Sequence, residues 1–305
     1  MKQSITDSIK ARLLNASRQR GEEFELYLVR YVCERFLYRL GESEHRERCT
    51  LKGASLLALW MEDPYRATRD VDLLALGGSD NSAVRKVMEE ICKINCEQDG
   101  LVFDISTLKV SPIRESQSYS GQRATIRVQL GSARVRLQVD IGFGDSMSPG
   151  PEVVAIPPML NHLPVPTVQA YPKVCSIAEK FEAMVTLGRR TSRMKDFHDI
   201  WALSESFSFD GLELQSALRQ CFERRNTDWV YHLPDVLIEG FYRSESLATR
   251  WRAYIRKGSF RQAPPPEFVL IGERVLLLFL PIRHSVLNGA EFQALWRKQG
   301  PWSSQ

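Results

Sequence analysis

Long apolar runs are missing from the 305-residue chain. Nowhere do eighteen apolar residues follow one another, and the opening MKQSITDSIKARLL lacks the apolar centre of a signal peptide. We therefore expect a cytoplasmic protein with no membrane partner. The six cysteines are scattered and none forms a C-x-x-C pair, so the usual pattern of a structural zinc site is absent and reduced thiols are favoured.

What the chain does contain is typical of a globular protein. Hydrophobic residues make up 43% and charged residues 26% of the sequence, which excludes collagen-like, coiled-coil and wholly disordered chains. The formal net charge of +4 is compatible with a nucleotide or nucleic-acid partner, although so small an excess identifies neither. The length is sufficient for two domains.

The first half alternates between helical and extended patterns. Residues 4–40 carry apolar side chains at helical spacing, and Gly41 ends the pattern. A strand around 49–51, a glycine turn and a helix follow, then the strand VDLLALGG, the helix SAVRKVMEEICKI and three extended segments between 101 and 144. This order predicts a mixed β-sheet flanked by helices.

Prolines are concentrated in residues 149–172, where a continuous helix is excluded because proline lacks a backbone donor and restricts the preceding residue. Helical patterns dominate the sequence beyond this segment. We predict an α+β protein: N-terminal helices and a catalytic domain in residues 1–148, a proline-rich connection in 149–172, and a mainly helical domain in 173–305.

The segment RATRDVDLL places two aspartates, Asp70 and Asp72, at the start of a hydrophobic strand. Side chains alternate along a strand, so both carboxylates point the same way. Like charges this close repel unless a cation lies between them, and oxygen ligands suit Mg²⁺. A solvated strand start, with Arg66 and Arg69 as ion-pair partners, explains the same residues. A D-x-D alone favours that simpler interpretation.

Two further segments supply candidates for the same site. The turn Lys52-Gly53-Ala54-Ser55 lies between a strand and a helix, where free backbone N–H groups and a glycine suit phosphate oxygens, although such glycines are often only turn residues. In LQVDIGFGD, Asp140 interrupts an apolar strand face and could provide a third carboxylate. A solvent-facing strand end is the alternative, and Asp145 competes for the role.

Five segments in this order resemble a known family: KGASLLALW, RATRDVDLL, LQVDIGFGD, AEKFEAMVTLG and RMKDFHDIWAL. They are similar to the nucleotidyltransferase AbiEii/AbiGii toxins, a branch of the polymerase-beta-like nucleotidyltransferases. The resemblance covers roughly residues 25–225. It implies a nucleotidyltransferase that takes a nucleoside triphosphate and Mg²⁺, and acts as the toxin of a toxin–antitoxin pair in phage defence, with a separately encoded antitoxin.

The resemblance also implies roles for individual residues. Asp70 and Asp72 would bind the metal, and Asp140 would orient or deprotonate the attacking hydroxyl. The phosphate-binding candidates are Lys52, Gly53, Ser55 and Arg66. In the general signature a serine or glycine follows the turn glycine, whereas here Ala54 does and the hydroxyl comes one residue later.

Two more candidates lie in the second half of the chain. The resemblance matches a helical lysine to Lys180 and an aspartate after a K-D pair to Asp196. On the residues alone, Lys180 could be an ordinary surface lysine, or pair weakly with Glu179 or Glu182. Asp196 could simply stabilise a helix start.

The resemblance suggests RNA, and a tRNA 3′ end in particular, as the acceptor. Basic and aromatic residues of the segment 241–262 support RNA binding, since together they offer phosphate contacts and stacking surfaces. An amphipathic helix with buried aromatics explains this segment equally well. Two other functions stay open: transfer to a small molecule such as an aminoglycoside, and a non-catalytic interaction protein on the same fold.

Overall fold

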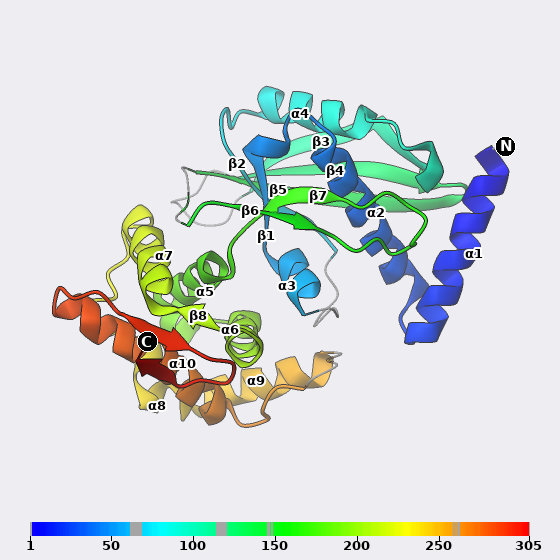
Figure 1. Ribbon diagram of the computed structural model, residues 1–305. Coiled ribbons are helices and arrows are strands. Elements are labelled where there is room, and N and C mark those ends of the chain that lie inside the picture. Colours follow the sequence, from blue (N-terminus) through cyan, green and yellow to red (C-terminus); the bar gives the residue numbers. More distant parts are fainter. Residues whose placement is uncertain are drawn as a thin grey trace. The chain divides into compact units, whose positions relative to one another are not determined.

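The computed structural model describes residues 2–61, 69–113, 121–144, 147, 149–258, 260 and 263–304. The chain divides into two compact units (Figure 1). The first comprises Met1–Trp60, Ala67–Ser146 and Pro151–Tyr171, and the second comprises Met61–Arg66, Met147–Gly150 and Pro172–Gln305. Each unit has its own secondary structure and core.

The first unit is built on a seven-stranded mixed sheet of order β3-β4-β5-β2-β1-β7-β6. Its strands are β1 (Cys49–Lys52), β2 (Val71–Ala75), β3 (Leu101–Ile113), β4 (Gly121–Leu130), β5 (Ala133–Phe143), β6 (Glu152–Ala155) and β7 (Thr167–Ala170). The β2–β5 and β1–β7 pairs are parallel, and the other neighbours are antiparallel. This sheet and its helices confirm the predicted α+β class.

The first unit also contains helices that pack beside the sheet and on one another. They are α1 (Lys2–Arg20), α2 (Phe24–Gly41), α3 (Ala54–Trp60) and α4 (Asn81–Lys93), with the 3₁₀ turns η1 (Arg46–Arg48) and η2 (Glu97–Asp99). Figure 1 shows α4 lying along the sheet, where it contacts β3 and β4, while α2 contacts β5 and β7. The Asp80 carboxylate starts α4 by accepting from the backbone N–H groups of Ser82 and Ala83.

The proline-rich segment, which we predicted to connect two domains, contributes β6 and β7 to this sheet. Thr167–Ala170 pairs with β1 in parallel, and its prolines lie outside the paired residues. Proline is compatible with an edge of a sheet because no ladder donor is needed there. The second unit resumes at Pro172, at the start of a helix.

The second unit is mainly helical, as its sequence pattern predicts. Its helices are α5 (Lys173–Leu187), α6 (Met194–Ser206), α7 (Gly211–Arg224), α8 (Glu239–Tyr242), α9 (Glu245–Lys257) and α10 (Phe268–Leu287), with η3 (Gly188–Arg190) and η4 (Asp235–Leu237). A small antiparallel sheet joins β8 (Phe209–Asp210), β9 (Ala294–Trp296) and β10 (Trp302–Ser304). Within the described part of the chain, no helix is both long and apolar enough to cross a membrane.

Aromatic rings form much of the core of the second unit. Phe181 of α5 stacks on Phe279 of α10 with ring centroids 3.7 Å apart. The buried Glu182 beside it accepts hydrogen bonds from Thr186 at 2.7 Å and Thr227 at 2.8 Å, and also pairs with Arg225. A buried carboxylate is stable here because its charge is paired and hydrogen-bonded.

Candidate functional site

Three carboxylates of the first unit meet at one end of the sheet. Asp70, Asp72 and Asp140 each offer an oxygen, and these oxygens all lie within 4.8 Å of one another. Asp70 immediately precedes β2, and Asp72 lies directly beside Asp140 because β2 and β5 pair in parallel with these residues in register. The structure therefore brings together the three acids that the sequence singled out.

The alternation of side chains along the two strands explains why these acids share a face. Val71 and Leu73 of β2 and Val139 of β5 are buried in the apolar core, so the intervening Asp72 and Asp140 point to the opposite face. All three aspartates keep partial access to solvent. A cation could therefore reach their carboxylates.

The glycine turn lies against this cluster. Lys52 is the β1 partner of Asp72 in the antiparallel register, so Gly53 follows directly beside the carboxylate. Gly53 has a φ of +74°, and a Cβ atom at this position would lie 2.1 Å from Oδ2 of Asp72. Only glycine fits, because a side chain here would displace the aspartate. The Lys52 ammonium lies 5.7 Å from the ring centroid of Tyr171.

The other phosphate-binding candidates are placed differently. The Ser55 hydroxyl donates to the backbone carbonyl of Asp70 at 3.4 Å, which directs it to the start of β2. Arg66 and Asp145 lie outside the described residues.

Sequence reasoning missed Arg123 of β4. Its guanidinium forms a bidentate ion pair with Asp140, with Nε 2.8 Å from Oδ1 and Nη2 2.7 Å from Oδ2. Gln138 Nε2 donates to the same carboxylate at 3.4 Å. The signal for Arg123 was present: β4 and β5 are joined by a two-residue turn at Gly131, and counting outward from that turn pairs Arg123 with Asp140.

The charges of this cluster favour a bound divalent cation. Three carboxylates within 4.8 Å repel one another, and the Arg123 guanidinium offsets the charge of Asp140. Carboxylate oxygens are the ligands that Mg²⁺ prefers, with water or phosphate oxygens filling the rest of its octahedron. The donor set thus fits Mg²⁺ in both charge and chemistry.

Lys180 and Asp196 come together in the second unit. The Lys180 ammonium lies 2.6 Å from Asp199 Oδ2 and 3.7 Å from Asp196 Oδ1, and both aspartate side chains are only 1% exposed. Arg193 adds a second cation, with its Nε 2.7 Å from Asp196 Oδ2. Lys180 therefore pairs with two aspartates across the α5–α6 contact, whereas Glu179 and Glu182, its expected partners, pair with arginines of α7 and the residues after it.

The histidine and the aromatics near this network belong to the core. His198 is fully buried and its Nδ1 lies 2.9 Å from the Tyr254 hydroxyl, so it packs in the core. Trp251 of α9 is also fully buried and donates from Nε1 to the carbonyl of Pro265. Arg250 of α9 donates to the Thr191 carbonyl at 2.6 Å. These contacts support the amphipathic-helix interpretation of the segment 241–262.

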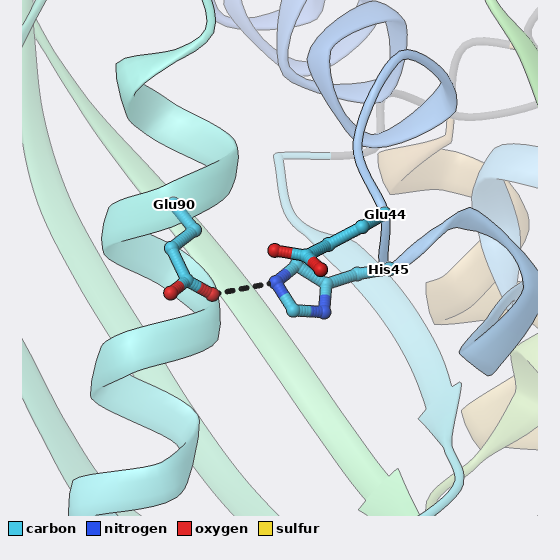
Figure 2. A group of neighbouring side chains, drawn as sticks. All are labelled: Glu44, His45 and Glu90. Atoms are coloured by element: carbon cyan, nitrogen blue, oxygen red, sulfur yellow. Dashed lines mark hydrogen bonds and ion pairs between the residues drawn. The ribbon is translucent and has the colours of Figure 1, made fainter.

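A second group of potential metal ligands consists of Glu44, His45 and Glu90 (Figure 2). His45 Nε2 lies 2.8 Å from Glu90 Oε2, and this bond connects the turn after α2 to helix α4. Glu44 is exposed, while His45 is buried. The pairing explains the burial of His45 without a metal, so we assign the group a structural role.

Comparison with protein families assigns the chain to a family. Residues 35–273 match the family described as nucleotidyl transferase AbiEii toxin of a type IV toxin–antitoxin system. A search of curated proteins gave no significant match.

Two solved structures from Helicobacter pylori are similar to the chain. One is described as a candidate nucleotidyltransferase, with 14% identity, a TM-score of 0.44 and coverage of 85% of this chain and 94% of that one. The other is JHP933, with 15% identity, a TM-score of 0.45 and coverage of 84% and 90% respectively. The family match spans more than half of the chain and includes all three clustered aspartates. The protein is therefore a nucleotidyltransferase and belongs to the AbiEii toxin family.

Proposed function

We propose that the protein transfers a nucleoside monophosphate from a nucleoside triphosphate to a hydroxyl of RNA, with a tRNA 3′ end as the preferred acceptor. The observation that supports this most is the convergence of Asp70, Asp72 and Asp140 within 4.8 Å. The acceptor oxygen would attack the α-phosphorus, a new P–O bond would form, and pyrophosphate would leave. Cytoplasmic action on RNA, held in check by the antitoxin, would explain toxicity.

Asp70 and Asp72 would hold Mg²⁺. The ion, when bound, would neutralise charge on the phosphates and align them for in-line displacement. Asp72 is held in position by its neighbours: Gly53 lies directly against its carboxylate and Lys52 faces it across the β1–β2 pair. The Lys52 ammonium and the Gly53 backbone would then contact phosphate oxygens.

Asp140 would orient the acceptor hydroxyl and accept its proton. Arg123 holds both carboxylate oxygens and so fixes the orientation of Asp140. Because Asp140 also lies beside Asp72 in register, the hydroxyl that it binds would be next to the metal ligands. We propose Arg123 as a positioning residue for Asp140.

The roles of Ser55, Arg66, Lys180 and Asp196 in nucleotide binding remain predictions. Asp196 and Lys180 share an ion-pair network of their own, and the Ser55 hydroxyl already donates to a backbone carbonyl. Substitutions of these residues can be scored in the same assay.

The test is label transfer from each of the four radiolabelled nucleoside triphosphates to total RNA in the presence of Mg²⁺. We compare the wild type with Asp72→Asn, which keeps the shape of the side chain but removes its charge. The matched control is Asp7→Asn, since Asp7 is an exposed carboxylate of α1 that belongs to no acidic cluster among the described residues.

We expect label in small RNA with the wild type and the control. Asp72→Asn should reduce transfer by about 100-fold or more, because losing several kcal/mol of charge stabilisation costs about a factor of ten per 1.4 kcal/mol. Equal labelling by the wild type and Asp72→Asn would refute the metal-binding role of Asp72. Label on a small molecule such as an aminoglycoside, with none on RNA, would refute the proposed acceptor.

A further inference from the structure

The polar face of strands β3, β4 and β5 carries an excess of positive charge. The hydrogen bonds of Asp140 with Arg123 and Gln138 identify this face, because the three side chains must lie on one side of the sheet. Alternation along the strands then places four further cations on it. These are Lys109 of β3, Arg127 of β4, and Arg134 and Arg136 of β5, and we call them the basic strip.

Two arginines of the basic strip face each other directly. Arg127 and Arg136 are partners in the antiparallel β4–β5 register, and both are exposed. Like charges directly opposite each other destabilise a sheet by a few tenths to about 1 kcal/mol. Among the residues that the structure describes, no ion pair involves the guanidinium groups of Arg127, Arg134 or Arg136. The fold thus keeps a repulsive pair that folding itself does not require.

One acid lies close to the basic strip. Asp104 of β3 is the register partner of Arg127, but its carboxylate accepts from the Ser106 hydroxyl at 2.6 Å and forms no ion pair among the described residues. The strip therefore keeps a net charge of about three positive units when Asp104 is counted. An anionic partner would relieve this repulsion.

The opposite face of these strands is already occupied. Ile126, Leu137 and Val139 are buried there, and helices α2 and α4 contact the same strands. The basic strip lies on the face that also bears Asp72 and Asp140. Arg127 is four residues along β4 from Arg123, which corresponds to about 13 Å of extended strand.

We propose that the basic strip binds the sugar-phosphate backbone of the RNA acceptor and leads its 3′ end to Asp140. This assignment rests on the proposed function. Guanidinium groups pair with phosphate oxygens in bidentate geometry, and a row of cations across three strands matches a chain of phosphates better than a single small ligand. Contacts to phosphate oxygens carry no sequence information, so this binding would be independent of base sequence.

The test compares two double variants by fluorescence anisotropy with 5′-labelled total tRNA over a range of salt concentrations. Arg127→Gln with Arg136→Gln removes the facing pair. Arg18→Gln with Arg20→Gln is the control, because these are exposed arginines on α1, outside the sheet. Thermal unfolding checks the fold, and the first double variant should be at least as stable as the wild type because it removes a repulsion.

We expect the Arg127/Arg136 variant to bind tRNA about tenfold or more weakly at 0.1 M salt. The slope of log K against log salt should fall by roughly 1.4 to 1.8 if each arginine neutralises one phosphate. The control should match the wild type in both affinity and slope.

Three outcomes would overturn the assignment in distinguishable ways. If the wild type binds triphosphate with Mg²⁺ but neither binds nor labels RNA, the proposed acceptor is wrong. If the wild type labels RNA and both double variants bind it equally well, the basic strip is not the RNA surface. If the Arg127/Arg136 variant keeps RNA binding but loses its antitoxin, the strip binds the antitoxin instead.

Discussion

Replacing Gly53 by alanine tests the geometry of the acidic cluster most directly. The new Cβ would lie 2.1 Å from Oδ2, 2.8 Å from Cγ and 3.0 Å from Cβ of Asp72. Carbon and oxygen atoms do not approach this closely, so the carboxylate must move by about 1 Å to reach a tight but possible contact. A displacement of this size at a reacting centre costs about 100-fold in rate.

The variant also carries a backbone cost, which can be measured separately. An L-residue at the Gly53 φ of +74° costs about 1–2 kcal/mol. Gly21 has a similar φ of +66°, but a Cβ there would meet nothing within 4 Å. Gly21→Ala therefore reports the backbone cost alone, and the difference between the two variants reports the contact with Asp72.

The assays are thermal unfolding and label transfer at a series of Mg²⁺ concentrations. We expect both variants to lose a few degrees in Tm, at about 2–4 °C per kcal/mol. Only Gly53→Ala should lose transfer activity by about 100-fold and require more Mg²⁺. If Gly53→Ala keeps wild-type activity and its Tm falls no further than that of Gly21→Ala, the close approach of Gly53 to Asp72 has no functional importance.

Three further predictions concern charge. Asp72→Asn should raise the Tm in the absence of Mg²⁺, because unit charges 4.8 Å apart repel by about 3.5 kcal/mol at an effective dielectric constant of 20. Mg²⁺ should then stabilise the wild type but not the variant, and a lower Tm of the variant without Mg²⁺ would contradict the repulsion. Lys180→Met should lower the free energy of unfolding, measured in urea, by about 3–5 kcal/mol, because it leaves the buried Asp199 carboxylate without the Lys180 ammonium. Unchanged stability together with lost nucleotide transfer would instead assign Lys180 to phosphate binding. Burial raises the pKa of the Cys33 and Cys92 thiols from 9.0 to about 12. Above pH 9 these thiols ionise in the unfolded chain but stay protonated in the folded protein, so the free energy of unfolding should fall between pH 9 and 12. It should fall less in the double variant Cys33→Ala, Cys92→Ala.

Local patterns in the sequence were enough to predict most elements of the first unit. The strand around 49–51, the D-x-D strand and the helix of residues 81–93 all form where their periodicity placed them. The three extended segments predicted between 101 and 144 form β3, β4 and β5. Within the predicted helical domain of residues 173–305, the C-terminal part forms α10 and also the short strands β9 and β10.

Sequence patterns were enough to predict the acidic residues of the site. Asp70 and Asp72 were found as a D-x-D pair at the start of a strand, and Asp140 as an aspartate that interrupts an apolar strand face. The partners of charged residues were harder to predict. Lys180 pairs with Asp199 rather than with its neighbours on α5, because helix packing brings α6 alongside it.

The sequence by itself determined which residues are helical or extended and which face of each strand is polar, because these depend on side chains only a few positions apart. Tertiary structure decided that β2 and β5 lie side by side in parallel, which places Asp72 next to Asp140. Strand neighbours and register are set by backbone hydrogen bonds and core packing between residues far apart in the chain, which no local pattern specifies.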